Sequence, residues 1–176
     1  MRTRLRAAAK FVDRANRAFG RLLGWTVILL VLIQFTLVLA SSVFHIGSIK
    51  FQESLLYLNA LMFLGGAGYV LLVDGHVRVD LKYRAASRRF RARVNLWGTL
   101  LLLWPVCGLI LWYGLPLAIA SWATLETSQE ISGLPIFFLM KSFIPLFALT
   151  LAAQGISLVN ASLDVLVPEP DRTAES

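Results

Sequence analysis

Charge is missing from long stretches of this 176-residue sequence. Four runs of at least 20 residues contain no Asp, Glu, Lys or Arg, namely residues 22–44, 54–73, 94–125 and 142–163. An α-helix needs about 20 mainly apolar residues to cross the hydrocarbon core of a bilayer, so each run is long enough. A soluble chain of this length is too short to cover four helices that are apolar on all sides. The sequence therefore predicts an all-α integral membrane protein with four transmembrane helices.

Cysteine and histidine are nearly absent. Cys107 is the only cysteine, which excludes a disulfide framework and a CxxC motif, and we expect it to pack as a small apolar residue. The only histidines, His45 and His76, flank the second run and so lie on opposite sides of the membrane. A helical rise of 1.5 Å per residue separates them by about 30–45 Å, too far to bind one haem iron. A cytochrome b is thereby excluded, and His76 is expected to be a structural hydrogen-bonding residue.

Ionisable residues, which mark ion and proton pathways in membrane proteins, are absent from the interior of the runs. The only amide side chains well inside them are Gln34, Asn59 and Gln154, which can hydrogen-bond between helices. Hydrolase motifs of the G-x-S-x-G and H-E-x-x-H types are also missing. The residues therefore indicate neither an enzyme nor a metal or cofactor site, and they argue against a channel that works alone.

Basic residues are concentrated before the first run and between the second and third runs. These two segments hold 14 of the 17 basic residues: Arg2, Arg4, Arg6, Lys10, Arg14, Arg17, Arg21, Arg78, Lys82, Arg84, Arg88, Arg89, Arg91 and Arg93. The positive-inside rule places both segments in the cytoplasm, and four spans return the C-terminus there. The membrane topology thus explains where the basic residues lie, and we expect no nucleic-acid partner. The first run is too long for a signal peptide and lacks a following cleavage site, so it is expected to stay as an anchor.

The predicted organisation is a single four-helix membrane domain over residues 1–167, followed by a short polar tail at 168–176. Spans are expected at about residues 22–44, 54–73, 94–120 and 142–163. Basic and apolar residues fall on separate helical faces of residues 1–20, which predicts an N-terminal amphipathic helix lying in the membrane interface. The same basic residues also act as a topology signal, and the two interpretations are compatible.

Small residues cluster in the second run. Gly65 and Gly66 are followed by Ala67 and Gly68. Small residues let helix backbones approach closely in lipid, so this segment predicts a tight helix–helix contact. Whether the neighbouring helix belongs to this chain or to a partner is left open.

The loop after the second run, DGHVRVDLKYR at residues 74–84, is polar and basic. Asp74 and Arg78 are spaced i, i+4, as are Asp80 and Arg84, so each pair could form a contact on a short helix. A turn would be enough to join two spans. The composition of this loop therefore suggests that it has a role of its own.

The predicted outer side of the membrane carries few charges. Glu53 lies at the edge of the second span, where it can pair with Lys50 or act as a tether within the chain or to a partner. Glu126 and Glu130 lie in the main external segment, residues 121–141, and Lys141 lies at its far edge. These three residues are candidates for contact with an external protein.

Together these residues resemble the small membrane subunit (DctQ type) of TRAP transporters, the tripartite ATP-independent periplasmic transporters. The resemblance is carried by Glu53, the small residues at 65–68, GHVRVDLKYR at 75–84 and ASRRFRAR at 86–93, and it covers about residues 20–160. Glu53, His76, Arg78 and Asp80 match the family's motif positions, where the resemblance implies structural roles. Glu126, Lys141 and Gln154 match a narrower branch of the family.

The resemblance implies a partner system. A large membrane subunit (DctM type) would carry the substrate and sodium sites, and a periplasmic binding protein (DctP type) would deliver an organic acid. The small subunit would then be a scaffold in the bacterial inner membrane, with no cofactor of its own. Two alternatives from other classes are a homo-oligomeric small transporter or channel and a membrane anchor for an enzyme complex.

Overall fold

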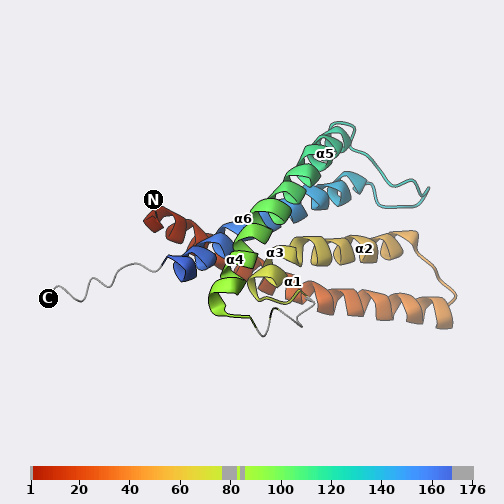
Figure 1. Ribbon diagram of the computed structural model, residues 1–176. Coiled ribbons are helices and arrows are strands. Elements are labelled where there is room, and N and C mark those ends of the chain that lie inside the picture. The colour runs from red at the N-terminus through yellow and green to blue at the C-terminus, as the bar shows by residue number, and fades with distance from the viewer. Residues whose placement is uncertain (1, 77–82, 84–85, 168–176) are drawn as a thin grey trace.

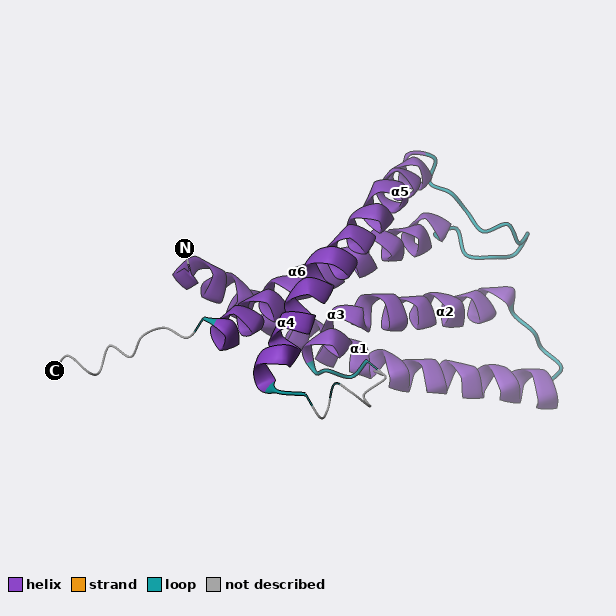
Figure 2. Ribbon diagram, viewed as in Figure 1, coloured by secondary structure: helices purple, strands orange, loops and turns teal. Residues whose placement is uncertain are grey.

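The computed structural model describes residues 2–76, 83 and 86–167, and every regular element in these residues is helical. At one end of the molecule, here called the terminal end, α1 (Arg2–Val43) begins and α6 (Phe137–Leu166) finishes (Figure 1). At the opposite end, here called the loop end, lie the connections at residues 44–48 and 124–136 (Figure 2).

The second and third spans are each built from three consecutive helical segments. The second comprises α2 (Ile49–Ala60), η1 (Leu61–Gly65) and α3 (Gly66–Leu72), and the third comprises α4 (Arg88–Gly98), η2 (Thr99–Leu103) and α5 (Trp104–Ala123). Both η segments are single π-helical turns. The turn in η2 contains Leu101, four residues before Pro105, and in a regular α-helix the proline ring would clash with the carbonyl of Leu101.

Four helices are long and apolar enough to cross a membrane, which confirms the predicted all-α membrane architecture. All four helices begin before the expected spans, and the third and fourth also end later. The third span begins at Arg88, because Ser87 caps α4 by accepting a hydrogen bond from the Phe90 amide at 3.3 Å. The fourth begins at Phe137, because Gly133 and Pro135 interrupt the chain before this residue and the apolar segment after it is helical.

The N-terminal segment is helical but does not form a separate helix. α1 continues without interruption from Arg2 to Val43, a length of about 63 Å at the rise of an α-helix. In the first half of α1, Ala9 and Asn16 are buried, and Arg6 forms an ion pair of 2.8 Å with Asp164 of α6. This segment is therefore held by protein contacts. Its expected position in the membrane interface stays a prediction.

Helix α6 is the centre of the molecule. It contacts every other helical element of the described chain, whereas α5 contacts only α6 and η2. Ala148 and Leu151 of α6 form a buried cluster with Ala67 and Cys107, so Cys107 packs as a small apolar side chain. The α1–α2 pair and the α5–α6 pair converge around this region and diverge toward the loop end (Figure 1).

The small residues of the second span pack against helices of this same chain. A Cβ added to Gly65 would lie 3.3 Å from the ring of Phe19 in α1. A Cβ on Gly68 would lie 2.9 Å from the carbonyl oxygen of Thr150 in α6 and 3.0 Å from the amide of Asn16. Gly68 therefore lies at a close crossing of α1, α3 and α6, so the neighbouring helices at this glycine belong to the same chain.

Replacing Gly68 with Val should destabilise the protein, because the added atoms meet backbone as well as side chain. Overpacking of this kind costs about 1–3 kcal/mol. Gly108→Val is the matched control, since a Cβ at Gly108 meets nothing within 4 Å. Thermal unfolding in mild detergent, followed by fluorescence-detected size exclusion, should show a lower midpoint for Gly68→Val alone. Equal midpoints for the two variants would contradict the close crossing.

Candidate functional site

A chain of buried polar side chains links α1 to α6 at the crossing. Gln154 of α6 is 2% exposed, and its amide oxygen accepts a hydrogen bond of 2.7 Å from the Asn16 side chain. Its amide nitrogen donates to the Asp13 carboxylate at 2.9 Å. Both ends of the Gln154 amide are thus satisfied by α1, which avoids the cost of several kcal/mol for an unpaired amide in apolar surroundings.

A second set of contacts closes the loop end. The Glu53 carboxylate at the start of α2 accepts hydrogen bonds from the Ser128 hydroxyl and, at 2.5 Å, from the Leu134 amide. Gly133 makes this approach possible, since a Cβ there would lie 2.7 Å from a Glu53 carboxylate oxygen and 2.4 Å from the Ser128 hydroxyl. We call the contact of Glu53 with residues 128–134 the loop clasp. It joins the second span to the connection between the third and fourth spans.

Glu126 holds together the two ends of that connection. Its carboxylate accepts hydrogen bonds from Ser121 at the end of α5, at 2.6 Å, and from Lys141 in α6, at 2.5 Å. The hydrogen bond from Lys141, followed by that from Ser121, lowers the pKa of Glu126 below its ordinary value of 4.5. The carboxylate is therefore charged at neutral pH, and this ion pair fixes how α5 and α6 meet at the loop end.

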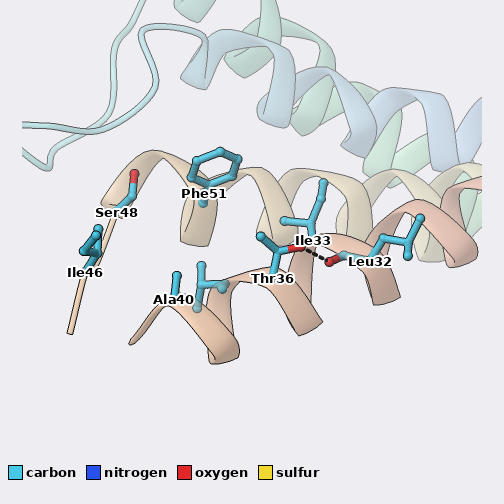
Figure 3. Close-up of a pocket in the computed structure, with 8 residues that line it drawn as sticks. Leu32, Ile33, Thr36, Ala40, Ile46, Ser48 and Phe51 are labelled. Carbon is cyan, nitrogen blue, oxygen red and sulfur yellow. Dashed lines mark hydrogen bonds between the residues drawn. The ribbon is translucent and has the colours of Figure 1, made fainter. Parts of the chain in front are cut away.

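An apolar groove lies between α1 and α2 near the loop end (Figure 3). Leu32, Ile33 and Phe51 line it, together with Thr36. The Thr36 hydroxyl donates to the Leu32 carbonyl at 2.8 Å, so it offers the groove no free donor. A lining of this kind suits an acyl chain or an apolar side chain and provides no catalytic group.

A second groove between α1 and α2 is lined by three amides, Gln34, Gln52 and Asn59, among leucines. We call it the amide groove. All three side chains are exposed, and none makes a hydrogen bond with another described residue. Gln34 and Asn59 belong to spans that cross a membrane, where water is not available to satisfy them. The amide groove is therefore suited to a neighbour that brings hydrogen-bonding groups of its own.

Residues 30–163 match the family described as "Tripartite ATP-independent periplasmic transporters, DctQ component". This match covers well over half of the chain. The chain belongs to the DctQ family. It is the small membrane subunit of a TRAP transporter, as its residues suggested. No curated protein and no solved structure matches the sequence.

The residues singled out in this DctQ subunit fall at opposite ends of the molecule. Glu53, Glu126 and Lys141 come together at the loop end, where each contacts the same connection. Glu130 lies there too, but its side chain is exposed. Its backbone amide donates to the Ser128 hydroxyl, and its carbonyl accepts a hydrogen bond of 2.9 Å from the Gly133 amide.

Asp74 and His76 lie in the connection between the second and third spans, and both are exposed. Asp74 has a positive φ of 56°, as suits the tight turn that follows α3. Arg78 and Asp80 lie outside the described residues, as does the tail at 168–176, so the proposed pairs on a short helix stay predictions. Among the described residues no group of His, Cys, Asp and Glu could hold a metal ion.

The sequence drew attention to Gln154 and Glu53 of this DctQ subunit, but it did not predict their hydrogen-bond partners. Gln154 stood out as an amide inside a span, but Asn16 and Asp13 are 138 and 141 residues away along the chain. Glu53 stood out beside its span, but it binds a serine hydroxyl and a backbone amide, and neither has a distinctive sequence pattern. Gly133 was visible only as a helix breaker.

Replacing Glu53 with Gln should loosen the loop clasp, because a neutral amide is a poorer acceptor than a carboxylate. Hydrogen bonds to charged groups contribute about 1.5–3 kcal/mol, so amide exchange at residues 128–134 should rise by about tenfold or more. Hydrogen–deuterium exchange with mass spectrometry measures this directly. Glu130→Gln is the control, since its carboxylate makes no contact in the clasp. Unchanged exchange in Glu53→Gln would refute the tether.

Proposed function

We propose that this chain is the small permease subunit of a sodium-coupled, binding-protein-dependent importer of an organic acid, and that it scaffolds the large transport subunit. Substrate and sodium sites would lie on a DctM-type subunit, and a DctP-type periplasmic protein would deliver the substrate. Membership of the DctQ family supports the tripartite assembly. The lack of ionisable residues deep within the spans supports a bracing role for this subunit.

The amide groove is the observation that carries the scaffold proposal. Gln154 is satisfied inside the chain, whereas Gln34 and Asn59 have no partner among the described residues. Lipid tails cannot hydrogen-bond, so lipid would leave both amides unpaired. A transmembrane helix that carries polar side chains would satisfy them. We therefore assign the α1–α2 face to contact with the large subunit.

We further propose that the chain lies in the bacterial inner membrane with both termini in the cytoplasm. The basic starts of α1 and α4 lie toward the terminal end, and the positive-inside rule favours the cytoplasm for that end. The loop end would then face the periplasm. Both of its connections would be open to a periplasmic protein.

The tip of the 124–136 connection is the part best suited to touch the binding protein. Glu126 and Lys141 are engaged with each other, so neither is free to form an ion pair outside the chain without breaking this one. Glu130 is exposed, and the neighbouring Ile131 is fully exposed. An apolar side chain beside an unpaired carboxylate provides both contact area and charge for a docking protein.

The double variant Gln34→Leu/Asn59→Leu should bind the large subunit more weakly. Interhelical hydrogen bonds in membranes contribute about 0.6 kcal/mol each on average, so recovery of the large subunit should fall by about tenfold at limiting concentration. The measurement is co-purification from native membranes in mild detergent, quantified by mass spectrometry. Trp112→Leu, at an exposed position on α5, is the control.

Undiminished recovery for the double variant would contradict the assignment of the α1–α2 face. Lower recovery of the large subunit with Trp112→Leu instead would place the contact with that subunit on α5. Recovery of the wild-type chain alone, as a stable homo-oligomer, would favour the alternative of a self-contained transporter.

Substrate uptake should become more dependent on binding protein when the loop tip is altered. In Glu130→Ala/Ile131→Ser, uptake by proteoliposomes should fall several-fold at limiting binding protein and recover at saturating binding protein. Ser132→Ala, beside the tip, is the control. Equal uptake by variant and wild type at limiting binding protein would exclude the tip as a docking contact.

A further inference from the structure

A groove of about 320 Å³ opens between α4 and α6 near the terminal end. Arg88, Arg91 and Asn95 are spaced i, i+3 and i+7, so they share one face of α4. Leu158 and Ser162 of α6 form part of the opposite wall. The two helices approach closely because Ala92, which also lines the groove, is small and buried. We call this feature the arginine groove.

The arginine groove has a surplus of positive charge. The side chains of Arg88 and Arg91 form no hydrogen bond or ion pair with any described residue. Among the described residues that line the groove, Asp74 is the only acidic one. Asp164, near the end of α6, pairs with Arg6 of α1 and is not among the lining residues. The described lining therefore carries two guanidinium groups and one carboxylate around a space large enough for a ligand.

One wall of the arginine groove is mainly polar and the opposite wall is mainly apolar. Arg88 and Arg91 lie in the basic first part of the third span, before the uncharged run that begins at Val94. Ala161 and Val165 of α6 provide an apolar wall, and Tyr83 is held at the groove by a hydrogen bond of 2.9 Å from its hydroxyl to Asn95. Such a site accommodates a molecule with an anionic head and an apolar body.

We propose that the arginine groove binds the phosphate group of an anionic phospholipid. Arginine is the side chain best suited to phosphate oxygens, because its guanidinium donates two parallel hydrogen bonds. Basic pockets between transmembrane helices are a recurrent binding mode for cardiolipin-type head groups. The groove would hold the head group against Arg88 and Arg91 and direct the acyl chains along α4 and α6. This proposal does not depend on which face meets the large subunit.

The test is lipid retention by the assembled complex. Complexes carrying wild-type or Arg88→Gln/Arg91→Gln subunit are placed in phosphatidylcholine nanodiscs that contain a minor fraction of cardiolipin. Native mass spectrometry then measures the cardiolipin that stays bound to this subunit. Each basic residue near an anionic surface is worth about a fivefold factor in affinity, so the double variant should lose on the order of 30-fold. Arg88→Lys/Arg91→Lys should retain most of the bound lipid.

The matched control is Arg89→Gln/Arg93→Gln, which removes the same charge from the same helix at residues that do not line the groove. Retention that falls only in Arg88→Gln/Arg91→Gln supports the proposal. An equal fall in both variants would show general charge attraction and overturn it, as would no fall in either. Displacement of cardiolipin by inorganic phosphate, but not by chloride at matched ionic strength, would identify a soluble anion as the ligand and overturn the lipid assignment.

Discussion

The buried Gln154 amide is the contact on which the arrangement of the helices depends. It is satisfied at both ends by α1, through Asn16 and Asp13, beside the glycine crossing. In lipid, helices gain little from burying apolar surface against one another, so close packing and hydrogen bonds determine which helices associate. Gly68 allows the close approach, and Gln154 makes the hydrogen bonds. Together they fix α6 at the centre, where it contacts every other described element.

The two ends of this DctQ subunit differ in how they are held. At the loop end, Glu53 and Glu126 each hold the connection between α5 and α6, and their partners lie within the chain. At the terminal end, Arg6 is paired with Asp164, while Arg88 and Arg91 face an open groove. The loop end is thus held by contacts within the chain, whereas the terminal end keeps two arginines that have no partner among the described residues.

The three intramembrane amides show that the sequence predicts which polar residues lie inside the spans but not which neighbours they contact. Gln34, Asn59 and Gln154 look equivalent in the sequence, because each lies inside an uncharged run. The fold separates them: Gln154 turns inward to α1, and the other two line an exposed groove. Helical periodicity alone could not make this distinction, since it depends on which helix lies opposite each face. Likewise, Glu53 could have paired with Lys50, and only the fold brings Ser128 and Leu134 to it.

The sequence by itself determined the number of spans, the helical class and the family. These depend on run length, absence of charge and short local motifs, which tertiary contacts do not alter. The tertiary structure alone decided that residues 2–43 form one helix, that the small residues at 65–68 pack within the chain, and that Glu53 clasps the 128–134 segment. The second and third of these features depend on contacts between residues far apart in the sequence, and the first depends on whether the helix breaks. The local sequence pattern does not show which residues lie opposite a given side chain.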